Sequence, residues 1–162
     1  MAQVELAKEL FDENKLESYY EKLDHHKKEV FIILVKAIFE LSERAINHDE
    51  SKFNPIEKKI FSKNDFKYKF GTKEYENNKE NLKIALRHHY ALNRHHPEFF
   101  EYGIEEMNLI DLLEMIADWM SASKHYENGD INKSINILKT KYKIGLQLEK
   151  VLRNTVEYLK NE

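Results

Sequence analysis

Histidine is the residue type in this 162-residue chain with the most potential for chemistry. Seven of the eight histidines fall into tight groups, namely His25-His26, His48, and His88-His89 with His95-His96. Neutral imidazole is a common metal ligand, and it titrates near neutral pH. Cysteine is absent, which excludes disulfides, thiolate zinc sites and cysteine nucleophiles. The histidine groups therefore predict either metal coordination by nitrogen and oxygen atoms or acid-base chemistry.

The dyad His48-Asp49 follows a long apolar segment. Neighbouring side chains at a helix end can both turn toward one point in space. A hard divalent ion accepts that mixture of imidazole and carboxylate, and without thiolates Mn²⁺, Fe²⁺ or Mg²⁺ is expected rather than structural Zn²⁺. Lys52 lies three residues after Asp49, and Asp118 lies in a later apolar segment. We expect His48, Asp49 and Asp118 to converge on one cation.

Helical periodicity predicts the elements that position these residues. Residues 24–46 carry an apolar stripe at three- and four-residue steps, from Val30 to Ala45, which predicts a core helix. Further helices are predicted at about 55–61, 74–92, 108–126, 130–142 and 144–160, with one or two short amphipathic helices within 3–22 and a short extended segment within 62–73. The predicted fold is an all-α bundle of six or seven helices that forms one domain over residues 1–162.

Composition narrows the range of functions. Glycine (4) and proline (2) are too scarce for a strand-rich domain with many tight turns. The net charge of −3 gives no strong sign of nucleic-acid binding. The sequence contains no 18-residue apolar run and no signal-peptide pattern at its first residues, so we expect a cytoplasmic protein without a membrane partner. Residues 52–83 hold nine lysines and five acidic residues. This excess of positive charge indicates either a solvated loop or an electrostatic field that attracts a phosphorylated ligand.

The sequence resembles the HD superfamily of metal-dependent phosphohydrolases. That pattern has a first histidine, then a His-Asp pair that often continues as HDxxK, and finally a distant aspartate. In this sequence the first histidine corresponds to His26, the HDxxK segment to His48-Asp49 with Lys52, and the distant aspartate to Asp118. More narrowly, four motifs resemble a family of small phage and bacterial HD-like proteins over about residues 26–155: HDESKF, HHYALNRHHPEFF, MNLIDLLEMIADW and YENGDINKSI. The resemblance implies that His26, His48, Asp49 and Asp118 bind one metal ion and that Lys52 faces the substrate phosphate.

The paired histidines are similar in type to those that hold a second metal ion in binuclear HD enzymes. His88 and His95, like His89 and His96, are seven residues apart, which is two helical turns or about 10.5 Å. His89 continues the apolar side of its predicted helix, so we expect His89 and His96 to be metal ligands. The expected phosphate contacts are His88, Arg94 and His95. One or two ions are expected, of Mn, Fe, Mg, Ni or Co.

The assignment of His26 depends on a bend. In one straight helix His26 and His48 would lie about 33 Å apart, too far to share an ion. A turn near residues 39–42, with Ser42 capping a second short helix, would bring both ends together. The chain has no glycine or proline between residues 24 and 54, and His25 is an adjacent alternative to His26.

These features predict an enzyme that hydrolyses a phosphate ester or anhydride, on a nucleotide or a nucleotide-like signal. Asp49 and Lys52 are the expected catalytic residues, and the expected partner is a small phosphorylated substrate, with an oligomer left open. The alternative is a non-catalytic protein that binds and sequesters a metal ion or a nucleotide. The sequence contains neither of the glycine-rich phosphate-binding motifs of nucleotide-binding proteins.

Overall fold

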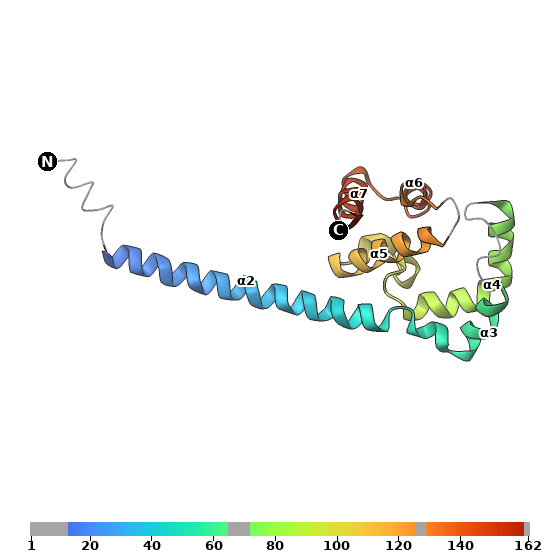
Figure 1. Ribbon diagram of the computed structural model, residues 1–162, viewed down its shortest axis with the longest axis horizontal. Coiled ribbons are helices and arrows are strands. Elements are labelled where there is room, and N and C mark those ends of the chain that lie inside the picture. The colour runs from blue at the N-terminus through green and yellow to red at the C-terminus, as the bar shows by residue number, and fades with distance from the viewer. Residues whose placement is uncertain (1–12, 65–71, 126–128, 161–162) are drawn as a thin grey trace. The chain divides into compact units, whose positions relative to one another are not determined.

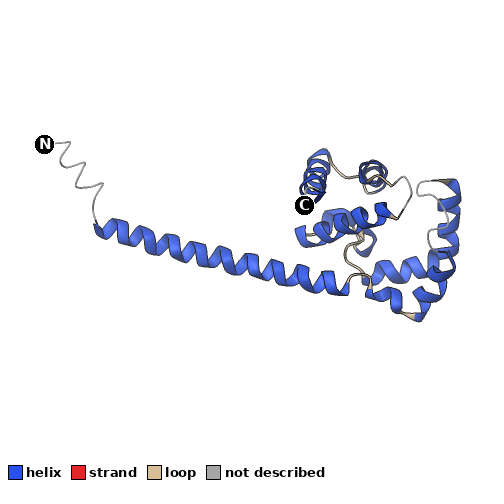
Figure 2. Cartoon of the chain, in the orientation of Figure 1, coloured by secondary structure: helices blue, strands red, loops and turns tan. Residues whose placement is uncertain are grey.

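A computed structural model describes residues 13–64, 72–125 and 129–160. These residues form six α-helices and three short 3-10 helices, and no strand occurs among them (Figures 1 and 2). The predicted all-α fold is therefore confirmed. The segment predicted to be extended falls largely on residues 65–71, and the start of the predicted N-terminal helices falls on residues 3–12, both outside the described residues.

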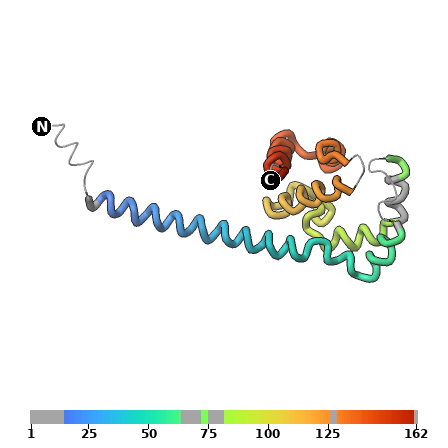
Figure 3. Tube along the Cα trace, viewed as in Figure 1, coloured from blue at the N-terminus to red at the C-terminus, as the bar shows by residue number. Residues whose placement is uncertain are grey.

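The helices follow one another along the chain as Figure 3 traces them. The α-helices are α2 (Glu13–Asn47), α3 (Pro55–Asn64), α4 (Lys73–Leu92), α5 (Leu109–Lys124), α6 (Ile131–Lys141) and α7 (Leu146–Lys160). The 3-10 helices are η1 (Glu50–Phe53), η2 (Pro97–Phe99) and η3 (Gly103–Glu106). Pro55 begins α3 and Pro97 begins η2, as expected for a residue that fixes φ and lacks an N–H group. The chain divides into two compact units, Met1–Ser42 and Glu43–Glu162.

The bend predicted within residues 26–48 is absent, because α2 runs without interruption from Glu13–Asn47. Ser42 does not cap a new helix: its Oγ donates to the carbonyl oxygen of Ile38 (2.8 Å), a contact made inside a continuing helix. The stretch contains no glycine or proline to interrupt the backbone hydrogen bonds. Ile33 and Leu34 of the apolar stripe are more than half exposed.

The buried core of the second unit lies among α5, α6 and α7. Met115 and Ile116 of α5 and Ile135 of α6 have no exposed surface, and they pack in one cluster with residues of α7. Burial on this scale stabilises each of these side chains by about 1.5 to 3 kcal/mol. Because the core fixes α5 along one face, it sets the position of the polar residues on the next face, Glu114 and Asp118.

A buried carboxylate ties α5 to two other parts of the second unit. Asp111 has no exposed surface and accepts two hydrogen bonds from Arg94 (3.0 and 2.9 Å) and one from Arg44 at the end of α2 (2.6 Å). It also completes a capping box with Asn108 at the start of α5. Burial alone would raise the pKa of the Asp111 carboxyl, but the two guanidinium groups hold it below its usual value. This anchor positions His48, which lies four residues after Arg44, and His95, which follows Arg94.

Candidate metal centre

The turn after α2 directs the first acidic ligand inward. Asp49 has a positive φ of 60°, in the left-handed region that few residues other than glycine, asparagine and aspartate adopt. η1 begins directly after it, and the backbone N–H of Lys52 donates to the carbonyl oxygen of Asp49 (2.8 Å). The turn separates Asp49 from the axis of α2 and places its carboxylate against the end of α4.

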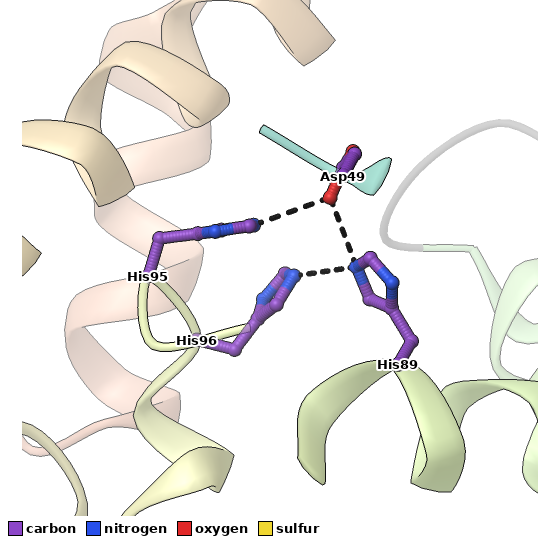
Figure 4. Close-up of side chains that lie close together, drawn as sticks. All are labelled: Asp49, His89, His95 and His96. Atoms are coloured by element: carbon purple, nitrogen blue, oxygen red, sulfur yellow. Dashed lines mark hydrogen bonds and ion pairs between the residues drawn. The ribbon is translucent and has the colours of Figure 1, made fainter. Parts of the chain in front are cut away.

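Four side chains meet at this turn (Figure 4). They are Asp49, His89 at the end of α4, and His95 and His96 in the loop before η2, and one potential ligand atom of each lies within 4.8 Å of the others. Asp49 Oδ1 is 3.2 Å from His89 Nε2 and 3.5 Å from His95 Nε2, and His89 Nε2 is 2.9 Å from His96 Nε2. We call this group the Asp49 cluster.

A second group of three residues shares one histidine with the first. His48, His95 and Asp118 also have potential ligand atoms within 4.8 Å of one another. His48 Nε2 lies 3.6 Å from Asp118 Oδ1 and 3.6 Å from Asp49 Oδ2. The His48 and Asp118 side chains are 30% and 25% exposed, whereas His95 is only 2% exposed. Solvent therefore reaches the centre from the side of His48 and Asp118.

Two carboxylates accept hydrogen bonds from the Nδ1 atoms of the histidines. Glu57 of α3 is fully buried and accepts from His88 Nδ1 (2.6 Å) and His89 Nδ1 (3.0 Å). Glu114 of α5 accepts from His48 Nδ1 (2.9 Å) and His95 Nδ1 (3.0 Å). These contacts orient the rings so that the Nε2 atoms of His48, His89 and His95 face the Asp49 carboxylate, an arrangement typical of metal-binding histidines.

The charges of the site are strongly coupled. Burial alone would raise the pKa of the Asp49 carboxyl, but its contacts with His89, His95 and Lys52 hold that pKa well below the usual range. Contacts with Asp118 and Glu114 raise the pKa of His48 to about 10. Burial and the neighbouring imidazoles His95 and His89 lower the pKa of His96 to about 2, which keeps this ring neutral. A neutral imidazole retains the lone pair that a metal ion requires.

The donor atoms fit a divalent cation. Among the described residues, Asp49 Oδ1 and His95 Nε2 are buried and make no hydrogen bond, although they lie 3.5 Å apart. Buried polar atoms without a partner cost about 1 to 3 kcal/mol each, and a cation between them removes that cost. Two atoms bound at about 2.1 Å to one ion are separated by roughly 3.0 to 3.4 Å, close to the spacings found here. The cluster of histidine and aspartate residues can therefore bind a metal ion.

Five of the six predicted metal ligands come together in this centre: His48, Asp49, His89, His96 and Asp118. The sixth, His26, is exposed in the unbroken helix α2, and the bend on which its assignment depended is absent. Its alternative, His25, is exposed and forms an ion pair with Glu29 (3.4 Å).

Three of the predicted phosphate contacts have other partners in the structure, and their role as phosphate contacts stays a prediction. His95 belongs to the ligand groups instead, because the loop of residues 93–96 ends the helix and cancels the two-turn spacing. His88 Nδ1 donates to Glu57, and the Arg94 guanidinium is paired with Asp111, so both have structural partners. Lys52 stays beside the centre: its Nζ donates to Asp49 Oδ2 (2.6 Å), and its side chain is half exposed.

Sequence reasoning missed the two supporting carboxylates. Glu114 lies four residues before Asp118, on the same face of α5, and this spacing was a usable signal. Glu57 sits between an isoleucine and two lysines in a polar helix, and no pattern distinguishes it from a surface residue.

The chain belongs to a family of unknown function (DUF5662), whose sequence profile matches residues 15–162. Comparison with curated proteins and with solved structures gives no match. Within the described residues, no helix has both the length and the apolar character needed to cross a membrane.

Proposed function

We propose that this protein is a metal-dependent phosphohydrolase of the HD type, which cleaves a phosphate ester or anhydride of a nucleotide or nucleotide-like molecule. The observation that carries the proposal is the pair of buried atoms without hydrogen bonds, Asp49 Oδ1 and His95 Nε2, inside a ring of histidines. The resemblance of the HDESKF segment and of Asp118 to the HD pattern supports it.

Each residue has a defined role in this proposal. Asp49, His89, His95 and His96 hold a divalent cation, and His48 and Asp118 form the side open to solvent. When bound, the ion supplies a Lewis acid that makes water more acidic near neutral pH. The Asp118 carboxylate takes the proton from the attacking water as the new P–O bond forms and the bond to the leaving group breaks.

Lys52 binds the phosphoryl group. Its ammonium lies on the exposed side of Asp49, 2.6 Å from Oδ2, where it can reach a phosphoryl oxygen without entering the ligand group. Loss of such a contact in the transition state typically costs about 3 kcal/mol, which is roughly a hundredfold in rate. We therefore expect Lys52→Ala to keep its metal content and to hydrolyse substrate at least tenfold more slowly.

The test is a screen for phosphate release. Metal-free protein is loaded with Mn²⁺, Fe²⁺ or Mg²⁺ and incubated with nucleoside mono-, di- and triphosphates and with simple phosphate esters. We expect turnover that requires the added ion and that is lost in Asp49→Asn. Lys58→Ala is the control for Lys52→Ala, because Lys58 is an exposed lysine of the neighbouring helix α3.

Two results would count against the proposal. Equal turnover of Lys52→Ala and Lys58→Ala would remove the phosphate-binding role of Lys52. If the metal-loaded protein released no phosphate from any compound but bound a nucleotide intact, the function would be sequestration of the nucleotide rather than its hydrolysis.

A further inference from the structure

A separate pocket of about 530 Å³ lies in the second unit. One face of α4, the 3-10 helix η2 and the end of α6 form its walls. None of its lining residues belongs to the Asp49 cluster or to the group of His48, His95 and Asp118. Its lining includes Lys83, Arg87, Tyr90, Glu98, Phe99 and Lys141. This volume lies in the range of sites for small organic ligands.

Cationic side chains outnumber acidic ones in the pocket lining. Lys83, Arg87 and Lys141 are cationic, and the one acidic lining residue, Glu98, is paired with Lys141 (2.5 Å). Among the residues that the structure describes, none forms an ion pair or hydrogen bond with the exposed Arg87 guanidinium. A guanidinium binds two oxygens of a phosphate at once, which makes arginine well suited to recognise that group.

Aromatic rings complete the pocket on the side of η2 and α4. Phe99 lines the pocket and is about one-third exposed, and the Arg94 guanidinium lies 5.3 Å from the centre of its ring. Tyr90 lines the pocket, and its ring also contacts that of His96, with 4.8 Å between the centroids. One tyrosine therefore separates the pocket from the Asp49 cluster. Rings of this kind hold a planar heterocycle by stacking.

We propose that this pocket binds a phosphorylated ligand with a planar ring, such as a nucleoside monophosphate, at a site distinct from the metal centre. The phosphate lies against Arg87 and Lys83, and the ring lies against Tyr90 and Phe99. The inference goes beyond the proposed function, because binding here uses no residue of the metal centre and requires no metal ion.

Calorimetric titration of the metal-free protein in a chelator tests the proposal. The probes are AMP, ribose 5-phosphate, adenosine and inorganic phosphate. We expect AMP to bind at least tenfold more tightly than ribose 5-phosphate or adenosine, since it alone uses both the cations and the rings. We expect Arg87→Gln to weaken AMP and ribose 5-phosphate at least tenfold and to leave adenosine unchanged. Phe99→Ala should remove most of the advantage of AMP over ribose 5-phosphate.

Matched variants distinguish binding in this pocket from general attraction to surface charge and from binding at the metal centre. Lys150→Gln removes an exposed positive charge of α7 outside the pocket and should leave AMP affinity unchanged. Asp49→Asn alters the metal centre and should also leave it unchanged. The proposal is overturned if AMP binds no better than inorganic phosphate, if Arg87→Gln binds AMP as the wild type does, or if Asp49→Asn abolishes binding. Because the protein is metal-free and no turnover is measured, failure here is distinct from failure of the proposed function.

Discussion

Replacing Glu57 with glutamine tests whether the carboxylates behind the histidines support metal binding. Glu57 is fully buried and accepts from the Nδ1 atoms of His88 and His89. Glutamine has the same shape, but one of its two polar groups is an NH₂ group that cannot accept a hydrogen bond. One of the two Nδ1–H groups therefore loses its acceptor, which weakens the hold of residue 57 on the neighbouring pair His88 and His89.

The size of the effect follows from these contacts. Loss of such a supporting partner typically lowers metal affinity 10- to 100-fold, which corresponds to about 1.4 to 2.7 kcal/mol. Loss of a buried hydrogen bond to a charged group also costs about 1.5 to 3 kcal/mol of folding free energy. For a chain of this size, the melting temperature of the metal-free protein should then fall by roughly 3 to 12 °C. Competition with a chelator for Mn²⁺ measures the affinity, and thermal unfolding measures the stability.

Glu149→Gln is the matched control for stability. Glu149 accepts hydrogen bonds from Lys139 and Arg153 and contacts neither ligand group. Its replacement should reduce stability without changing Mn²⁺ affinity. If folded Glu57→Gln bound Mn²⁺ as tightly as the wild type, the supporting role of the carboxylate would be refuted.

Three further predictions concern individual histidines. His95→Ala should lower Mn²⁺ affinity more than 100-fold in a calorimetric titration, because His95 belongs to both ligand groups; an unchanged affinity would exclude it as a ligand. His26→Ala should retain full metal content by elemental analysis, and a loss of metal would restore the bent arrangement of α2. Burial alone would lower the pKa of His95, but its contacts with Asp49 and Glu114 raise that pKa, so a metal ion that binds this ring competes with a proton. Affinity should therefore fall by up to about tenfold per pH unit as the pH falls from 8 to 6, and a flat profile would count against His95 as a ligand.

The helices after residue 50 could be predicted closely from the sequence. Pro55, Asn108 and Asp130 each mark a helix start, since proline fixes φ and the polar side chains accept from the first backbone N–H groups. The course of α2 was predicted less well. The bend was required only by the comparison with the HD pattern, whereas the local sequence has no residue that breaks a helix. The local sequence, which contains no helix-breaking residue, therefore predicts the observed unbroken helix better than the family pattern does.

The candidate site was predicted in part for a similar reason. His48, Asp49 and Asp118 could be identified because their residue types and their places at the ends or inside of apolar helices are local features. That His95 and His96 both join the Asp49 cluster could not be predicted, because helical spacing does not apply in the loop that holds them. Glu57 acts through a contact with His89, 32 residues away, and such a contact is set by the packing of α3 on α4 rather than by local sequence.

Anomalous diffraction from crystals grown with Mn²⁺ tests the central claim most directly. We predict a manganese peak between Asp49 Oδ1 and the Nε2 atoms of His89 and His95, at bonding distance from each. The same peak should disappear in crystals of His95→Ala. A wild-type crystal in which these atoms surround no manganese peak, or in which the ion binds only elsewhere, would contradict the metal centre.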